Sequence, residues 1–172
     1  MSNYNEEENL IRNRRGKWSD VGVPHKGWSC VDIEDLGSPE IECEMCESQT
    51  IRYVHHMQHP TYPHILKVGC VCGGHMEFDL LAAQLRETSM KNRASKRKRW
   101  LSRKWKLSLK GNQYLKTDGY RITVYERDSR WGATVSKEDN LITRHLFRMF
   151  ENQDEAKLGA FDLITLLESD NS

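Results

Sequence analysis

The sequence of 172 residues contains no apolar run that approaches the length of a membrane-spanning helix, and it shows no signal-peptide pattern. It also lacks internal repeats and a Gly/Ser-rich linker. A glycine-rich phosphate loop, a nucleophile elbow and a Ser/His/Asp order are absent as well. These absences argue against a membrane protein, a P-loop nucleotide-binding protein and a serine hydrolase.

The sequence contains few cysteines and a low share of apolar residues. Only five cysteines occur, and four of them cluster within residues 43–72, which leaves Cys30 outside. A disulfide framework of a secreted protein is therefore not expected, and the sequence predicts a reducing, cytoplasmic setting. Apolar residues make up 37% of the chain, which is lean for one large core. Small modules stabilised by a metal ion are the favoured arrangement.

The clustered cysteines have the spacing of zinc ligands. Cys43 and Cys46 form a C-x-x-C pair, and Cys72-Gly-Gly-His75 provides a second pair. Thiolate and imidazole donors in paired turns suit tetrahedral Zn²⁺. Cys70 is the alternative fourth ligand in place of His75, because on a strand it would share a face with Cys72. The sequence leaves this choice open.

Between the two pairs, the pattern predicts a hairpin. Residues 50–57 are rich in strand formers, residues 59–63 contain two prolines that break the run, and residues 65–71 are apolar again. Two strands with a metal-binding turn at each end predict a zinc ribbon over residues 41–78. A short strand over residues 29–33 is expected to pack on it.

The charge is segregated along the chain. Residues 90–110 hold 10 of the 26 Lys and Arg and no acid, although the formal net charge of the whole chain is only +1. Helix formers without Gly or Pro predict a helix from residue 77 to about residue 103, with an apolar stripe that thins past Ala94. A basic helix of this kind is typical of phosphate binding. The candidate nucleic-acid-binding residues are Lys91, Arg93, Lys96, Arg97, Lys98, Arg99, Trp100, Arg103 and Lys104, within a basic stretch that runs from residue 91 to residue 110. The tryptophans at 100 and 105 either stack on bases or anchor the stretch to its own domain.

After residue 105 the apolar period changes from that of a helix to that of a strand. Alternating residues and the turn signal Asp118-Gly119 predict three or four antiparallel strands. Residues 141–150 are compatible with a further strand or a short helix, and the strand is favoured. Asn152 and Glu155 form a capping box that predicts a final helix covering the sheet. The expected fold is α+β, in four parts: a flexible tail (1–17), a zinc-ribbon domain (18–78), a basic connecting helix (79–104), and an antiparallel sheet with one helix (105–172).

Several of these segments resemble known families. The CxxC…CxCxxH pattern of residues 43–76, the basic stretch that ends at residues 99–105 and the helix start at residues 154–157 resemble small, uncharacterised zinc-ribbon proteins of bacteria and their phages. This resemblance implies the architecture and Zn²⁺ but no activity. The strands and final helix are similar, more loosely, to DNA-binding domains of phage integrases, in which a sheet face enters the major groove.

Three functions are compatible with the sequence. The first is zinc-stabilised nucleic-acid binding without catalysis, as in a phage or mobile-element regulator. The second is a protein-interaction module that modulates a host transcription, replication or defence complex. The third is a nuclease of the HNH type, because His55 and His56 lie between the two zinc half-sites, as the water-activating histidine does in those enzymes. That pattern wants an Asn soon downstream, and none occurs between Cys46 and Asn92, so nucleic-acid binding is the favoured function.

Overall fold

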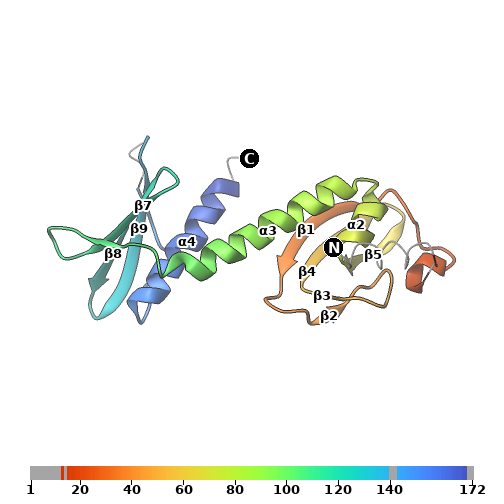
Figure 1. The fold of residues 1–172 in the computed structure, drawn as a ribbon, viewed down its shortest axis with the longest axis horizontal. Coiled ribbons are helices and arrows are strands. Elements are labelled where there is room, and N and C mark those ends of the chain that lie inside the picture. The colour runs from red at the N-terminus through yellow and green to blue at the C-terminus, as the bar shows by residue number, and fades with distance from the viewer. Residues whose placement is uncertain (1–12, 14, 140–142, 170–172) are drawn as a thin grey trace. The chain divides into compact units, whose positions relative to one another are not determined.

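The computed structural model describes residues 13, 15–139 and 143–169 and has mixed α+β architecture with antiparallel sheets (Figure 1). The chain divides into two compact units, Met1–Arg93 and Ala94–Ser172. The predicted α+β class is confirmed. In the described part of the chain, no helix has both the length and the apolar character needed to cross a bilayer.

The first unit combines a small sheet with two helices. Its elements are η1 (Gly16–Ser19), β1 (Ser29–Asp35), β2 (Ile41–Glu42), β3 (Thr50–Ile51), β4 (Tyr53–His59), β5 (Tyr62–Val68), α2 (Cys70–Glu77) and the first part of α3 (Leu80–Trp100). One sheet has the order β1-β4-β5, and β2 pairs with β3. The predicted strand at residues 29–33 and the predicted hairpin are confirmed as β1 and as β4–β5.

The core of the first unit lies around β4. Val54, His55 and Met57 of this strand are buried, and Trp18 and Trp28 pack in the same cluster. Buried residues on adjacent positions mean that both faces of β4 are covered, which is the pattern of a central strand. His55 is therefore an interior residue and does not lie on a solvent-exposed face.

The second half of the predicted zinc ribbon is different in the structure. The strand expected over residues 65–71 ends at Val68, and Cys70 begins helix α2. Close packing explains the helix: a Cβ on Gly74 would lie 2.7 Å from Leu80 Cα, and Gly73 lies against His55 and Val68. The two glycines therefore bring α2 close to its neighbours, and the argument that Cys70 and Cys72 share a strand face is wrong.

The predicted helix over residues 77–103 is confirmed as α3, which runs from Leu80 to Trp100 and is separated from α2 by Phe78 and Asp79. Phe78 has a left-handed conformation (φ 63°) and ends α2, and Asp79 then accepts a hydrogen bond from the amide of Ala82 through Oδ1 (2.9 Å). The side chain of Asp79 thus caps the start of α3. The sequence pattern placed the helix start three residues too early, at residue 77, because Phe78 is neither Gly nor Pro.

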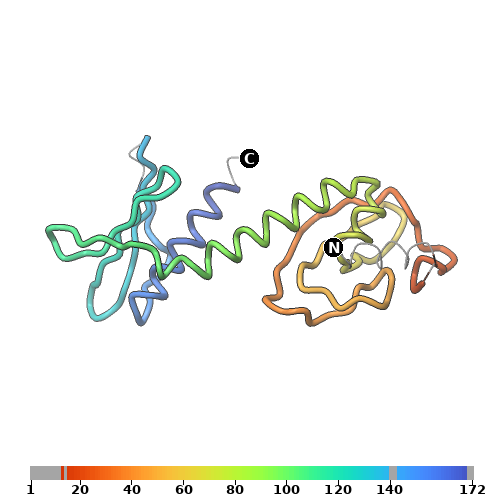
Figure 2. The backbone as a smooth tube through the Cα atoms, viewed as in Figure 1, coloured from red at the N-terminus to blue at the C-terminus, as the bar shows by residue number. Residues whose placement is uncertain are grey.

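The second unit is a sheet with one helix packed on it (Figure 2). Its elements are β6 (Lys106–Leu107), β7 (Gln113–Thr117), β8 (Tyr120–Arg127), β9 (Arg130–Lys137), β10 (Thr143–His145) and α4 (Gln153–Ser169). The order is β10-β9-β8-β7-β6, so the sheet has five strands where three or four were predicted. β10 confirms a further strand within residues 141–150.

Burial along β8 and β9 follows the strand period. Ile122 and Val124 of β8 and Ala133 and Val135 of β9 are buried, and they form one core cluster with α4. The capping box is confirmed at its first residue, because Asn152 Oδ1 accepts a hydrogen bond from the amide of Glu155 (2.8 Å). Most of the predicted tail (1–17) lies outside the described residues, although Gly16 and Lys17 belong to η1.

Candidate functional site

The C-x-x-C segment forms a tight turn. The amide of Glu47 donates to the carbonyl of Cys43 (2.8 Å), and the amide of Cys43 donates to the carbonyl of Gln49 (2.7 Å). Glu47 has φ 51°, so the chain reverses directly after Cys46. A turn of this kind directs both cysteine side chains to the same point.

Three cysteines meet at that point. The Sγ atoms of Cys43, Cys46 and Cys72 all lie within 4.8 Å of one another, and the three residues are buried. Cys43 and Cys46 belong to the turn before the β4–β5 hairpin, and Cys72 belongs to helix α2 after it. The group therefore links two segments that the hairpin separates in the sequence. Thiolates bound tetrahedrally at about 2.3 Å from zinc lie about 3.8 Å apart, and this spacing is compatible with the observed group. The cluster is able to hold a metal ion.

Proton sharing in this cluster favours a cation. Hydrogen bonding with Cys43 and Cys72 lowers the pKa of Cys46 to about 2, whereas hydrogen bonding with Cys46 raises the pKa of Cys43 to about 11. The pKa of Cys72 is raised as well, chiefly by hydrogen bonding with the other two thiols and then by burial. One of the three cysteines is therefore stable as a thiolate, and its negative charge opposes deprotonation of the other two thiols. A divalent cation removes that opposition.

The two candidate fourth ligands, His75 and Cys70, are placed differently. Neither joins the group formed by the three cysteines within 4.8 Å. His75 follows Cys72 by three residues on α2, which puts the two side chains on one helix face. Its Nε2 atom is buried and has no hydrogen-bond partner. Cys70 instead lies within 4.8 Å of ligand atoms of His55 and Glu87.

The adjacent histidines that suggested a nuclease lie in separate surroundings. His55 is 0% exposed and His56 is half-buried, with its Nε2 atom 3.2 Å from the carboxylate of Glu34. A phosphodiester has no access to His55 in this structure. Lys91, from the predicted nucleic-acid set, also lies here: its Nζ is 2.5 Å from Glu87 Oε1. Burial opposes ionisation of Glu87, but His55 and Lys91 outweigh it and lower the pKa of this carboxyl.

The remaining basic candidates are solvent-exposed. Arg93 is exposed near the end of the first unit, and six others lie in residues 96–104 of the second unit, which we term the basic segment. These are Lys96, Arg97, Lys98, Arg99, Arg103 and Lys104, all exposed. Arg97 makes a two-pronged contact with Asp162 (3.1 and 3.3 Å). Within the described residues, no carboxylate lies within 4.0 Å of the other five.

Trp100 is a core residue and is not available to bases. It is 3% exposed, its Nε1 donates to the carbonyl of Lys157 (2.7 Å), and its ring packs edge-on against Phe161. Trp105 contacts it edge-on, with ring centroids 6.1 Å apart. The alternative in which Trp100 stacks on nucleic acid therefore does not fit the structure. Trp100 anchors the end of α3 to the second unit.

Sequence reasoning missed two groups that contribute to these sites. The first is η1, which packs on the C-x-x-C turn: a Cβ on Gly16 would lie 2.7 Å from the backbone of Cys46, and Lys17 pairs with Glu47 at 2.6 Å. The second is Glu87, which looked like one acid among many on a helix. The signal for Glu87 was its i, i+4 relation to Lys91, which is common on exposed helices and therefore carries little information.

Comparison with protein-family models, with curated proteins and with solved structures finds no match. The resemblance to small zinc-ribbon proteins, and the looser ones to integrase and HNH domains, therefore remain predictions. The function has to be argued from the geometry of this chain.

Proposed function

We propose that the protein is a zinc-stabilised nucleic-acid-binding protein. The first unit holds a structural Zn²⁺, and the basic segment of the second unit contacts phosphates. The observation that carries the proposal is the basic segment itself, which holds six exposed cations at a helix end that Trp100 fixes to the core. Five of the six have no carboxylate within 4.0 Å among the described residues. Preorganised cations of this kind release counterions when they meet a polyphosphate backbone.

The zinc part of the proposal is supported by donor chemistry. Three clustered thiols are the donors that Zn²⁺ prefers, and His75 completes a Cys₃His set by a turn of its side chain, since its Nε2 is buried without a partner. Four protein ligands leave no position for water, so this ion stabilises the fold and does not activate a nucleophile. Zinc binding supplies on the order of 10 kcal/mol to the folding of such small modules.

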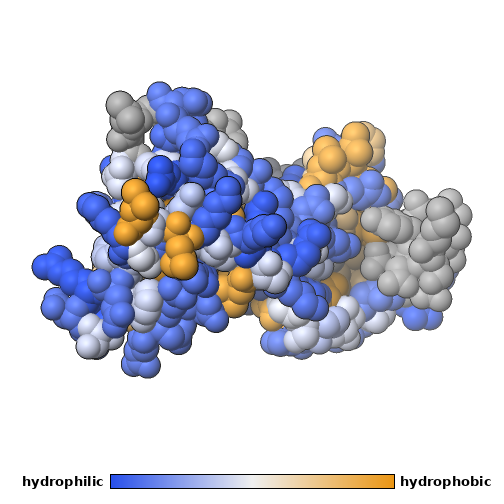
Figure 3. Space-filling view, turned by 60° about the vertical axis from the view of Figure 1, so that its left-hand side comes forward, coloured by the Kyte–Doolittle hydropathy of each residue, from blue (hydrophilic) through white to orange (hydrophobic). Residues whose placement is uncertain are grey.

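Charge distribution between the units supports the nucleic-acid part. The second unit has 16 Lys and Arg against 11 Asp and Glu, a formal net charge of +5, while the first unit has 10 against 14, a formal net charge of −4. The excess of positive charge therefore lies in the second unit. Most of the face drawn in Figure 3 is hydrophilic, and apolar side chains are exposed on it in a few places.

The second unit also presents a polar sheet face. Arg121 and Thr123 of β8 and Thr134 and Ser136 of β9 alternate with the buried residues and point away from the core cluster. Arg121 lies over the ring of Tyr114, 5.0 Å from its centroid. Arg, Thr and Ser side chains contact phosphates and base edges in protein–nucleic-acid complexes, so this face is a second candidate contact surface.

The test is a binding titration with a charge-matched control. The zinc-loaded protein is titrated with labelled duplex DNA, single-stranded DNA and RNA at low salt, with magnesium present and products resolved on a denaturing gel. The variant Lys98→Glu/Arg99→Glu changes two exposed cations on the basic segment. The control Arg144→Glu/Arg148→Glu makes the same charge change at two exposed positions of the second unit that lie outside the basic segment and outside the polar sheet face.

The proposal predicts binding with intact strands, lost in Lys98→Glu/Arg99→Glu and largely kept in the control. Equal losses in both variants would show that only net charge matters, and the basic segment would lose its assigned role. Absence of binding at low salt would overturn the proposal and favour the protein-interaction module. Cut strands would favour the nuclease hypothesis.

A further inference from the structure

A second group of potential ligands lies outside the three-cysteine cluster. His55 of β4, Cys70 of α2 and Glu87 of α3 come together, and their ligand atoms all lie within 4.8 Å of one another. All three residues belong to the first unit. His55 and Cys70 are buried and Glu87 is half-buried. The three donors are an imidazole nitrogen, a thiol sulfur and a carboxylate oxygen.

The imidazole of His55 has an unmet requirement in this group. Its Nε2 is buried and makes no hydrogen bond with any described residue; Glu87 Oε2 lies 3.7 Å away, within ion-pair range but beyond hydrogen-bond length. Its Nδ1 lies 4.0 Å from the Sγ of Cys30. Buried polar atoms are nearly always satisfied by protein, water or an ion. Cys30 donates its thiol hydrogen to the carbonyl of Asp32, so its Sγ is left to accept from Nδ1 of His55, and Nε2 then carries the lone pair beside Glu87 Oε2. A metal cation would satisfy that lone pair, with the thiol of Cys70 in the same group.

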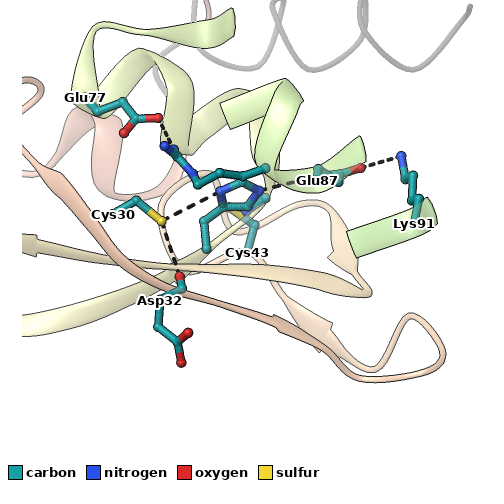
Figure 4. A network of polar contacts seen from close by, with 9 residues as sticks. Cys30, Asp32, Cys43, Glu77, Glu87 and Lys91 are labelled. Atoms are coloured by element: carbon teal, nitrogen blue, oxygen red, sulfur yellow. Dashed lines mark hydrogen bonds and ion pairs between the residues drawn. The ribbon is translucent and has the colours of Figure 1, made fainter. Parts of the chain in front are cut away.

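Contacts around the group orient its ligands. Lys91 Nζ lies 2.5 Å from Glu87 Oε1, and this contact leaves Oε2 directed at His55 (Figure 4). Cys30 Sγ approaches the nitrogen of His55 that faces away from Glu87 and is itself within 3.3 Å of the carbonyl of Asp32. Metal-binding histidines and carboxylates are usually held by such outer contacts, which fix the ring and the free oxygen.

We propose that His55, Cys70 and Glu87 form a second metal site, distinct from the three-cysteine centre. The mixed N, S and O donors suit a divalent transition metal, and Zn²⁺ accepts all three donor types. Three protein ligands leave a fourth position for a water or a small anion, and the half-buried Glu87 lies on the solvent side of the group. This inference does not depend on nucleic-acid binding.

The proposal makes Cys70 a ligand of the second site and not the fourth ligand of the first. The two arrangements predict different metal contents. With separate sites, the full chain binds two equivalents of metal. With Cys70 in the first centre, it binds one equivalent, and Glu87 has no part in it.

The experiment measures metal content and cobalt binding on the purified full chain. Wild type is compared with Glu87→Gln and Cys70→Ser, and with Glu34→Gln as a matched control, because Glu34 also contacts a histidine of β4 but has no cysteine beside it. Zinc is counted by elemental analysis after dialysis, and the metal-free protein is titrated with Co²⁺ under anaerobic conditions. Circular dichroism gives the folded fraction of each variant.

Two equivalents in wild type and Glu34→Gln, with one in Glu87→Gln and Cys70→Ser, would support the second site. The second cobalt equivalent should then add a weaker sulfur-to-metal charge-transfer band than the first, because one thiolate replaces three. One equivalent in wild type, unchanged in Glu87→Gln, would overturn the proposal. If either variant is unfolded, the cobalt titration of wild type decides: a single step contradicts a second site.

Discussion

Individual side chains decide which residues of the basic stretch are able to meet a ligand. Arg97 is held by Asp162 and Lys91 by Glu87, so these two cations already have acidic partners. Lys98 and Arg99 have no acidic partner among the described residues. On α3, Lys98 lies about opposite Trp100, and Arg99 lies beside it. The residues best placed for phosphate contact are therefore a subset of those that composition alone suggests.

Replacing Trp100 separates anchoring from stacking. Trp100→Phe removes the hydrogen bond to the carbonyl of Lys157 and part of the ring. The expected cost is about 1–3 kcal/mol of unfolding free energy, from the unpaired buried carbonyl and the small cavity. Urea unfolding measures this cost, and binding to duplex DNA is measured at a urea-free condition where the variant is folded. Lost affinity with unchanged stability would mean that Trp100 contacts nucleic acid after all.

At the scale of elements, the contact between α2 and α3 positions both proposed metal sites. α2 carries Cys70 and Cys72, and Gly74 is the point at which the helix approaches the start of α3. Small residues at such a crossing let two helices approach closely. Replacing them should move the cysteines relative to their partners.

Gly74→Ala and Gly73→Ala form a matched pair. A Cβ on Gly74 would lie 2.7 Å from Leu80 Cα, a backbone atom, whereas a Cβ on Gly73 meets nothing closer than 3.5 Å. Gly74→Ala should destabilise the first unit by about 1–3 kcal/mol and weaken metal binding. Gly73→Ala should be neutral or slightly stabilising because alanine favours a helix. Metal-dependent thermal unfolding measures both, and equal effects would show that close packing at Gly74 is unimportant.

The sequence predicts elements that have a regular period and misses those set by contacts distant in sequence. The β8 and β9 strands and the Asn152 cap follow from local patterns, and all of them are present. Helix α2 is missed because residues 65–71 form an apolar run typical of a strand, and the close approach of Gly74 to Leu80 is not visible in the local pattern.

In the candidate site, too, local spacing predicts some contacts, and contacts between distant segments are missed. The spacing of Cys43, Cys46 and Cys72 predicts their cluster, since each pair is close in sequence or follows a hairpin. The meeting of Cys70 with Glu87 is invisible to spacing, because it depends on the turn at Phe78 that starts a second helix. Trp100 was ambiguous for a related reason: its partner Phe161 lies 61 positions further along the chain.

At the scale of the whole molecule, the two units should respond differently to removal of the metal, because only one of their cores contains cysteines. The core of the first unit contains three of the clustered cysteines, while the core of the second unit contains no cysteine. Chelation should therefore unfold the first unit and leave the sheet unit folded. Cys43→Ser should have the same effect, and Cys30→Ser, outside the cluster, should not.

Backbone NMR spectra of the full chain before and after chelation measure this directly. Signals of β7, β8, β9 and α4 should persist while those of β1, β4 and β5 collapse to unfolded positions. Simultaneous loss of both sets would show that the two units fold as one. Full retention of both sets after the metal is removed would show that the cysteine cluster does not stabilise the fold.

The most direct test of the central claim is the salt dependence of duplex DNA binding. The observed association constant should fall with a slope of about −0.9 per phosphate neutralised when its logarithm is plotted against the logarithm of salt concentration. In Lys98→Glu/Arg99→Glu the slope should become shallower by about 2, one for each lost phosphate contact. In Arg144→Glu/Arg148→Glu it should stay near the wild-type value. A slope that is near zero in wild type, or that is the same in all three proteins, would contradict phosphate recognition by the basic segment.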